Sequence, residues 1–469
     1  MADADLCFLP ATELARRYRS RELSPVEVVD NALARIEQTA DALNCFAFVF
    51  GEEAREAARV AETAFAAGRP LGPLTGVPIA IKDLTPTAGK RTTLGSYAYE
   101  HWVPETSSVI VERLLGAGGI MVGKTTTPEF AYSSFTESPL WGATRNPWDP
   151  SRSPGGSSGG SGAAVAAGCV PLAEGTDMGG SVRIPASWSG VVGLKPTVGR
   201  IPLDILPSHF DSIGHFGPLA RTVDDARLFL SVAQGADDRD AMSLPALDLS
   251  GPLDRRAAGL RLALDVDLGD YAIDPEVERE VRAAADALRE AGADVVEVDV
   301  GWTRALASAW GQHWGVYLAA WFGHVLDEHR ERMDPSVVAL MEAGLAMNAV
   351  DFKRLEIVRT DAWRRLAAIL ADHDALLCPT MSQPARPVGE SDAMWDGTTA
   401  DGRYTGLDLT AQFNYMPACP VLSVPAGFTD GGLPVGLQVV ARRHQDDLAL
   451  RIGAALEDVR PWAGRRPPL

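Results

Sequence analysis

Two short turns built almost entirely of glycine and serine constrain this chain more than any other feature. They are GGSSGG at residues 155–160 and MGGS at residues 178–181, and an alanine-rich run at residues 163–168 lies between them. Glycine adopts backbone conformations that are closed to other residues and lets a ligand approach the main chain closely. Glycine-serine runs are most often flexible linkers, but linkers do not usually lie between alanine and valine runs. The pattern therefore favours two ordered turns.

The second turn has the composition of an acyl-transfer site. Its successive backbone amides could converge on an oxyanion, because no bulky side chain blocks the N–H groups. Ser181, at the end of the turn, would then be placed to attack the carbonyl whose oxygen the turn holds. The first turn lacks the Lys-Ser/Thr ending of a phosphate-binding loop. From spacing alone, a catalytic serine and a structural loop both remain open.

A serine nucleophile needs a base, and histidine is the usual one. His209 and His215 are the nearest downstream histidines. The residues around Ser181 do not resemble the G-x-S-x-G elbow of Ser-His-Asp hydrolases. His215 lies in residues 211–218, which we predict to form a turn. A Ser-His-Asp triad therefore remains possible in principle only.

Lysine is the alternative base. A lysine accepts a proton near neutral pH only when burial lowers its pKa from about 10.4. Lys82 directly follows the apolar run VPIAI at residues 77–81, which is compatible with a buried strand. The ordinary alternative is an ion pair with Asp83 or another acid at the end of that strand.

Several segments resemble the amidase-signature family of serine amide hydrolases. The central match joins residues 155–160 to residues 175–186 (GTDMGGSVRIPA) and 190–197 (GVVGLKPT). Upstream, LTGVPIAIKD at residues 74–83 is similar to the family's lysine segment. Shorter matches occupy residues 123–125, 128–131, 217–225 and 432–438. The matches span most of the chain, and the central block is long enough to be highly specific.

The resemblance implies hydrolysis of an amide C–N bond through an acyl-serine intermediate, without a metal or other cofactor. Ser181 would be the nucleophile, Ser157 a bridging serine on a cis peptide bond, and Lys82 the base. The oxyanion would be held by the backbone amides of Met178, Gly179, Gly180 and Ser181. Met178 and Ser189 depart from the family's usual residues, and we interpret both as substrate tuning or neutral drift.

Two functions within the family remain open. One is a stand-alone amidase for a small apolar or aryl amide, with esters or carbamates cleaved by the same route. The other is the glutaminase subunit of a tRNA-dependent amidotransferase. The aromatic-rich residues 302–321 do not resemble such glutaminase subunits, which favours the first.

Trp310, Trp314, Tyr317 and Trp321 share one face of a predicted helix. That face is most simply core or an oligomer interface, or else it lines the substrate pocket. Tyr132 and Ser133 are further candidates for the pocket.

Residues 118–125 (GGIMVGKT) match the P-loop pattern letter for letter. A P-loop follows a strand and opens a helix, whereas here a predicted helix precedes the glycine pair and the residues after it are strand-like. We therefore expect no nucleotide to bind there.

The formal net charge of −19 argues against a nucleic-acid partner. No uncharged apolar run is long enough to cross a membrane, so we expect no membrane span. The first residues (MADADLCFLP) show neither the basic start nor the apolar run that is typical of a signal peptide. The five scattered cysteines lack metal-ligand spacing, which is typical of reduced thiols in the cytoplasm. The expected partners are a small-molecule amide and, in a homodimer, a second copy of the chain.

Strand-like and helical segments alternate along all 469 residues, and no long polar linker interrupts them. This alternation favours one large α/β domain with a mixed sheet over residues 1–469. The resemblance adds a twisted sheet covered by helices on both faces. We expect the catalytic core at about residues 70–225 and a variable helical region on the substrate side at about residues 300–372.

Overall fold

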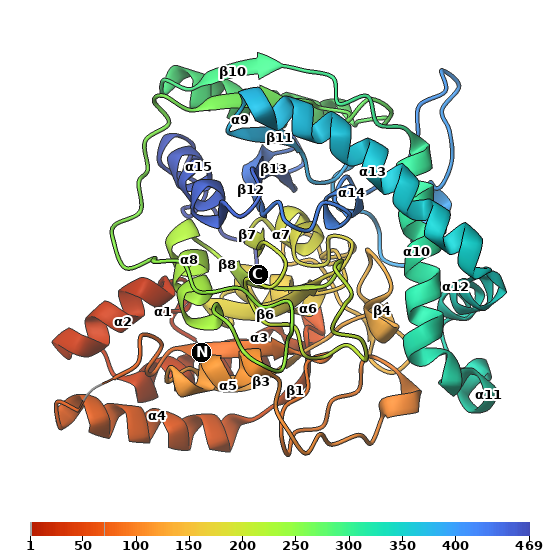
Figure 1. Cartoon of the computed structure of the whole chain (residues 1–469). Helices are drawn as coiled ribbons and strands as arrows, with labels where there is room; N and C mark the ends of the chain where they lie inside the picture. Colours follow the sequence, from red (N-terminus) through yellow and green to blue (C-terminus); the bar gives the residue numbers. More distant parts are fainter. Residues whose placement is uncertain (1, 70) are drawn as a thin grey trace.

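The computed structural model describes residues 2–69 and 71–469 (Figure 1). Its α-helices are α1 (Ala4–Cys7), α2 (Ala11–Ser20), α3 (Pro25–Leu43), α4 (Gly51–Ala66), α5 (Val109–Gly116), α6 (Gly159–Ala166), α7 (Arg183–Ser189), α8 (Val223–Ala233), α9 (Pro275–Glu290), α10 (Arg304–Phe322), α11 (Leu326–His329), α12 (Pro335–Ala346), α13 (Ala349–Asp372), α14 (Ala411–Asn414) and α15 (Asp446–Val459). Its strands are β1 (Phe46–Val49), β2 (Pro78–Lys82), β3 (Ile120–Thr125), β4 (Glu137–Ser138), β5 (Gly142–Ala143), β6 (Leu172–Asp177), β7 (Val192–Lys195), β8 (His215–Ala220), β9 (Arg261–Leu264), β10 (Asp294–Glu297), β11 (Ala375–Pro379), β12 (Val421–Phe428) and β13 (Pro434–Ala441).

A single mixed sheet organises the molecule. It has 11 strands in the order β1-β3-β2-β6-β8-β7-β12-β13-β11-β9-β10. Strand β2 runs parallel to β3 and β6, whereas β8 is antiparallel to both β6 and β7. Figure 1 shows β1 and β10 at opposite ends of the fold, with helices on both sides of the strands between them. The predicted α/β class with a central mixed sheet is confirmed.

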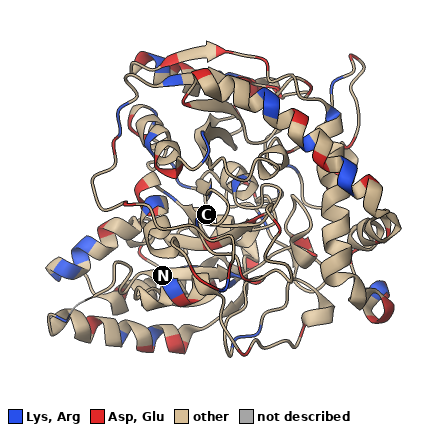
Figure 2. Cartoon of the chain, viewed as in Figure 1, with Lys and Arg blue, Asp and Glu red and all other residues tan. Residues whose placement is uncertain are grey.

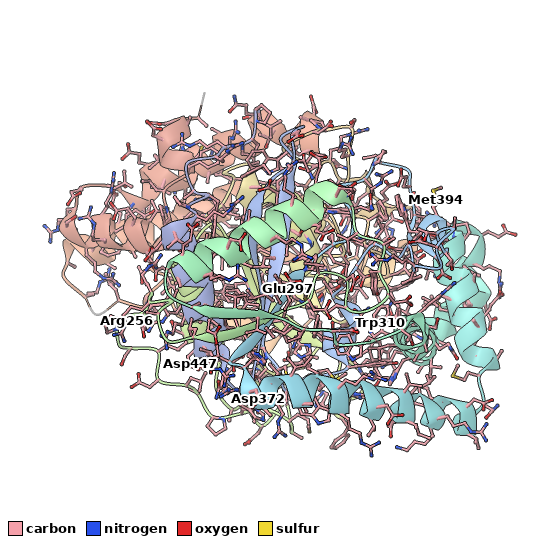
Figure 3. The ribbon with its side chains drawn as sticks, turned by 90° about the horizontal axis from the view of Figure 1, so that it is seen from above. Arg256, Glu297, Trp310, Asp372, Met394 and Asp447 are labelled. Carbon is pink, nitrogen blue, oxygen red and sulfur yellow. The ribbon has the colours of Figure 1, made fainter. Side chains whose placement is uncertain are left out.

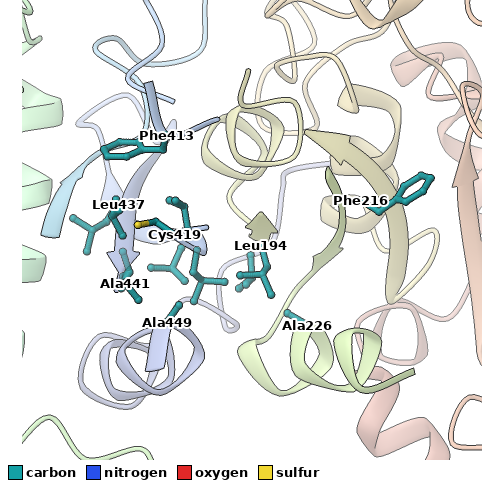
Figure 4. Packing of buried hydrophobic residues seen from close by; sticks show 14 of the residues in the cluster. Leu194, Phe216, Ala226, Phe413, Cys419, Leu437, Ala441 and Ala449 are labelled. Carbon is teal, nitrogen blue, oxygen red and sulfur yellow. The ribbon is translucent and has the colours of Figure 1, made fainter. Parts of the chain in front are cut away.

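The central strands are buried on both faces. All residues of β2, β6, β8 and β13 are buried, which removes the alternation of apolar and polar residues seen in strands with one solvated face. Strand β6 nevertheless carries buried polar side chains, among them Glu174 and Asp177. Leu437 and Ala441 of β13 pack in one cluster with Cys419 and with Ala449 of α15 (Figure 4). Charged side chains lie mainly along the outer helices, such as α4 and α13 (Figure 2). Within the described residues, no helix is long and apolar enough to cross a membrane.

Local sequence signals place several helices correctly. Ser24 accepts a hydrogen bond from the Val26 backbone N–H, and proline occupies the first turn of α3. Thr222 likewise caps α8 by accepting from the backbone N–H of Asp225. Serine and threonine are residue types that favour the N-cap position, so both helix starts follow from the local sequence.

One segment differs from the sequence prediction. Residues 211–218 are predicted to form a turn, but His215 begins strand β8. Glycine and proline in β8 conceal its strand pattern. Pairing with β6 on one side and β7 on the other nevertheless keeps this segment extended and buried.

Candidate active site

A cleft of about 480 Å³ opens between the turn that follows β6, helix α10 and the segment around residues 392–412. Ser181 lies in the wall of this cleft, directly after the glycine turn that follows β6. Such a volume suits a small-molecule site. Ser157 and Lys82 are both fully buried behind this surface.

Lys82 is the last residue of β2, and its side chain has no solvent contact. Its Nζ lies 2.7 Å from Ser157 Oγ and 2.9 Å from Thr176 Oγ1. Burial lowers the pKa of Lys82 to about 7, although the nearby carboxylates of Glu174 and Asp177 oppose this shift. A lysine in this state can accept a proton near neutral pH.

Lys82 does not form the ion pair that its sequence neighbour Asp83 would offer. The Asp83 carboxylate instead accepts the Thr93 backbone N–H at 3.1 Å and lies 3.8 Å from the buried amine of Lys124. Lys124 belongs to β3 and donates to the Thr85 carbonyl at 2.8 Å, so it contributes to the core. The P-loop-like residues 118–125 therefore contain a buried strand.

The two glycine-serine turns lie against each other. The backbone N–H of Ser158 donates to the Ser181 carbonyl at 3.1 Å, and the peptide bond between Gly156 and Ser157 is cis. Helix α6 begins at Gly159, immediately after the first turn. Lys82, Ser157 and Ser181 therefore come together from β2 and from the turns that precede α6 and α7.

A buried ion pair supports the Ser181 turn from behind. Asp177 and Arg183 are both completely buried, with Nη2 and Oδ1 2.8 Å apart. Burial alone would raise the pKa of Asp177, but the Arg183 guanidinium holds it below its usual range. The Asp177 carboxylate also accepts the backbone N–H groups of Gly180 and Val182 at 2.9 and 3.3 Å. This carboxylate therefore fixes the backbone on both sides of Ser181.

The hydrogen bond to Asp177 distinguishes Gly180 from the other proposed oxyanion donors. The amides of Met178, Gly179 and Ser181 donate to no acceptor in the described part of the chain, whereas the Gly180 amide is already paired. Met178, Gly179 and Ser181 are therefore the unpaired donors of the turn.

The cleft wall contains the two pocket candidates and part of the aromatic helix. Tyr132, Ser133, Trp310 and Trp314 all line it. Ser133 Oγ donates to Asp392 at 2.8 Å, and burial raises the pKa of Tyr132 to about 12. Tyr317 and Trp321, the other two residues of the predicted aromatic face, do not line the cleft; their rings pack on each other, and Trp321 also packs on Trp314.

The polar side of the cleft is acidic. It carries Asp392, Asp396 and Asp408, and no described lysine or arginine is among the lining residues. Burial, together with the charge of Asp392, raises the pKa of Asp408 to about 6. Asp396 is paired with Arg304 at 2.8 Å. The cleft thus offers hydrogen-bond acceptors and aromatic rings, but no cation, to a ligand.

The histidines closest to Ser181 in sequence are not placed to act on it. His215 is buried, and its Nδ1 lies 2.9 Å from the Ile213 carbonyl and 3.1 Å from the Asp177 carbonyl. Burial lowers the pKa of His215 to about 3, so the ring is neutral at physiological pH. His209 lies exposed in a loop. Across residues 2–69 and 71–469, no cluster of three or more His, Cys, Asp or Glu side chains forms a metal site.

Three contributors to the site escaped sequence reasoning. Thr176 contacts Lys82, Asn414 donates to Asp177 at 2.9 Å, and Glu174 accepts the Lys82 backbone N–H at 2.9 Å. Thr176 lies inside the matched block, but the block alone does not indicate its contact with Lys82. Asn414 comes from a segment more than 200 residues away, so no local pattern indicates it.

Comparison with known proteins agrees with this geometry. The family model described as Amidase matches residues 27–450. An acylamidase of Rhodococcus erythropolis is 38% identical and aligns over 100% of this chain and 98% of its own length. A glutamyl-tRNA(Gln) amidotransferase subunit from Chloroflexus aggregans is 36% identical, with 99% of both chains covered.

Among solved structures, a bacterial aryl acylamidase of the amidase signature family superposes with a TM-score of 0.92. It is 30% identical, and the match covers 98% of this chain and 99% of that one. A 6-aminohexanoate cyclic dimer hydrolase superposes with a TM-score of 0.85 at the same identity. The chain is therefore a member of the amidase family, and it is an enzyme that hydrolyses amides.

Proposed function

We propose that Ser181 is the nucleophile of this amidase, that Ser157 relays its proton, and that Lys82 is the base. The observation that carries the proposal is the 2.7 Å contact between Lys82 Nζ and Ser157 Oγ, made by an amine whose burial lowers its pKa to about 7. A catalytic lysine must be neutral to draw a proton from a hydroxyl.

The reaction then proceeds in two halves. Ser181 Oγ bonds to the amide carbonyl carbon while its proton passes to Ser157, whose own proton passes to Lys82 Nζ. The tetrahedral oxyanion is held by the amides of the glycine turn. The protonated relay returns a proton to the leaving nitrogen, the C–N bond breaks, and an acyl-serine remains. Water attacks the acyl-serine, which releases the carboxylic acid and regenerates Ser181.

We infer that the substrate is a small apolar or aryl amide. The aromatic rings of Trp310 and Trp314 in the cleft wall support this choice, as does the similarity to the two acylamidases. Glutamine carries a carboxylate that needs a cation, and none of the described cleft-lining residues is a lysine or an arginine. The acidic wall therefore favours a stand-alone amidase over a glutaminase subunit.

We further propose that the whole chain acts as one catalytic unit in the cytoplasm. Residues 70–225 would supply Lys82, Ser157 and Ser181, and residues 300–372 would supply the substrate side. The α10 residues in the cleft lining support the assignment of residues 300–372 to the substrate side. The absence of disulfides among the described cysteines supports the cytoplasmic location.

The test uses the purified chain with an anilide, a benzamide, a phenyl carbamate and glutamine as substrates. The chain alone should hydrolyse the anilide and leave glutamine intact. Ser181→Ala should lower kcat by about 10⁴-fold or more. Ser231→Ala, which changes an exposed serine of α8 outside the cleft, should not change it.

A fluorophosphonate probe identifies the nucleophile directly. Mass spectrometry should find the label on Ser181 in the wild-type enzyme and no label in the Ser181→Ala variant. Full activity in that variant would overturn the assignment of the nucleophile. Glutamine turnover that appears only with a partner protein would favour the glutaminase.

A further inference from the structure

Helix α10 reaches the glycine turn through one side chain. The indole Nε1–H of Trp310 donates to the Met178 carbonyl at 3.2 Å. Figure 3 labels Trp310 on this helix, and its ring lines the same cleft as Ser181. The contact joins two elements that are more than 100 residues apart in sequence.

The ring also lies directly against the next residue of the turn. A Cβ atom added to Gly179 would collide with the six-membered ring of Trp310. Only a glycine fits between this ring and the turn that carries Ser181. Trp310 therefore limits both the position of the turn and the direction of its first peptide unit.

The direction of that peptide unit matters because a peptide bond is planar and trans. The C=O of Met178 and the N–H of Gly179 lie in this plane and point in opposite directions. A hydrogen bond that fixes the direction of the Met178 carbonyl therefore also fixes the direction of the Gly179 N–H. That N–H donates to no acceptor in the described part of the chain, so it is free for a ligand oxygen. The next peptide unit is held in a similar way, since Thr410 Oγ1 donates to the Gly179 carbonyl and the Gly180 N–H donates to Asp177.

Trp310 is itself held by its surroundings. It stacks on Trp314 with ring centroids 6.0 Å apart and an angle of 18° between the planes. Trp314 is 4% exposed, and α10 packs against α12 and α13. A side chain packed in this way can hold a hydrogen-bond partner with little loss of entropy on catalysis.

We propose that Trp310 is a positioning residue that orients the Gly179 N–H for the oxyanion of the tetrahedral intermediate. This inference rests on the proposed function, in which Ser181 attacks an amide at this turn. Trp310 touches no reacting atom in this role. It acts through the Met178–Gly179 peptide and contributes more to the transition state than to binding of the intact amide.

The test compares Trp310→Phe with Trp314→Phe. Phenylalanine keeps an aromatic ring in the cleft and removes only the indole N–H and part of the ring area. Trp314 is a matched control because its Nε1 makes no hydrogen bond among the described residues, although it lines the same cleft. Both substitutions thus shrink the aromatic wall, and only the first removes a hydrogen bond to the turn.

Two ligands distinguish stabilisation of the oxyanion from binding of the intact amide. A phenylboronic acid forms a tetrahedral adduct with a nucleophilic serine and reports on the oxyanion site. The Kd of an intact anilide, measured in the Ser181→Ala background, reports on ground-state binding. Trp310→Phe should lower kcat by about 10-fold, which is less than the loss of a direct oxyanion donor. It should weaken the boronate by a similar factor and change the anilide Kd less than about 2-fold. Trp314→Phe keeps the indole N–H of Trp310 and leaves an aromatic ring for Trp310 to pack against. It should therefore leave the ratio of the boronate affinity to the anilide affinity unchanged.

Equal weakening of boronate and anilide in Trp310→Phe would overturn the inference, because Trp310 would then be only a wall of the pocket. An unchanged boronate affinity and kcat would also overturn it. A failure of the proposed function would appear instead in the wild-type enzyme, which would neither bind the boronate nor hydrolyse the anilide.

Discussion

Lys82 shows how far the surroundings of one residue decide its chemistry. Its amine is hydrogen-bonded to two hydroxyl groups, those of Ser157 and Thr176. The carboxylate next to it in sequence, that of Asp83, lies near the amine of Lys124 instead. Without a bonded carboxylate, burial dominates and lowers the pKa to about 7. A surface lysine would remain protonated and could not serve as a base.

The pH dependence of hydrolysis follows from this lowered pKa. The neutral form of Lys82 predominates above pH 7, so kcat/KM should be highest there. It should fall about tenfold per pH unit below that point as the amine becomes protonated. Initial rates with an anilide between pH 5 and 9 measure the profile. A flat profile across this range would contradict the role of Lys82.

Glu174 provides a control on that profile. It is fully buried, burial raises its pKa to about 7, and its charge raises the pKa of Lys82. Glu174→Gln removes the charge, so the acidic limb should move to lower pH while the enzyme remains active. Lys82→Arg should instead lose activity at every pH, because arginine stays protonated.

At the scale of the element, sequence signals succeed where they are local. The caps of α3 and α8 depend on residues two or three positions apart, and both use a residue type that favours the N-cap. Strand β8 depends on partners from elsewhere in the chain, and its glycine and proline concealed it. Pairing with β6 and β7, rather than intrinsic propensity, makes residues 215–220 a strand.

The cap of α8 gives a test at this scale. Thr222→Ala removes the side-chain acceptor of the Asp225 N–H and should lower the free energy of unfolding by about 1 kcal/mol. Urea unfolding, followed by circular dichroism, measures the change. Thr63 is an exposed residue of α4. The substitution Thr63→Ala should be neutral or slightly stabilising, because alanine has the higher helix propensity. Equal destabilisation by the two variants would show that the cap contributes nothing.

At the scale of the whole molecule, one continuous sheet joins the N-terminal and C-terminal parts. Arg183 of α7 bonds to Asp177, the last residue of β6, and also to Gln438 of β13 at 2.7 Å. The turn that carries Ser181 and the closing strands thus share one buried network. Removing one partner of such a buried ion pair typically costs about 3–5 kcal/mol.

The five cysteines report on the integrity of this single core. All five are free and buried, and burial raises the pKa of the Cys378 thiol well above its usual value. Burial also keeps a reagent in solution away from all five thiols, so they react slowly. The native enzyme should therefore react slowly with Ellman's reagent, and the unfolded chain should release the colour of five thiols. Rapid reaction of several thiols in the native protein would contradict this packing.

The sequence by itself determined the family and the α/β class, and it singled out Lys82, Ser157 and Ser181 as candidate catalytic residues, because the motifs that carry them are contiguous and their glycine-serine chemistry is distinctive. Tertiary structure alone decided that Lys82 avoids Asp83, that Asp177 pairs with Gly180, and that Trp310 meets Met178. These contacts join segments or orient groups in three dimensions. Their energies depend on burial and direction, which spacing along the chain does not encode.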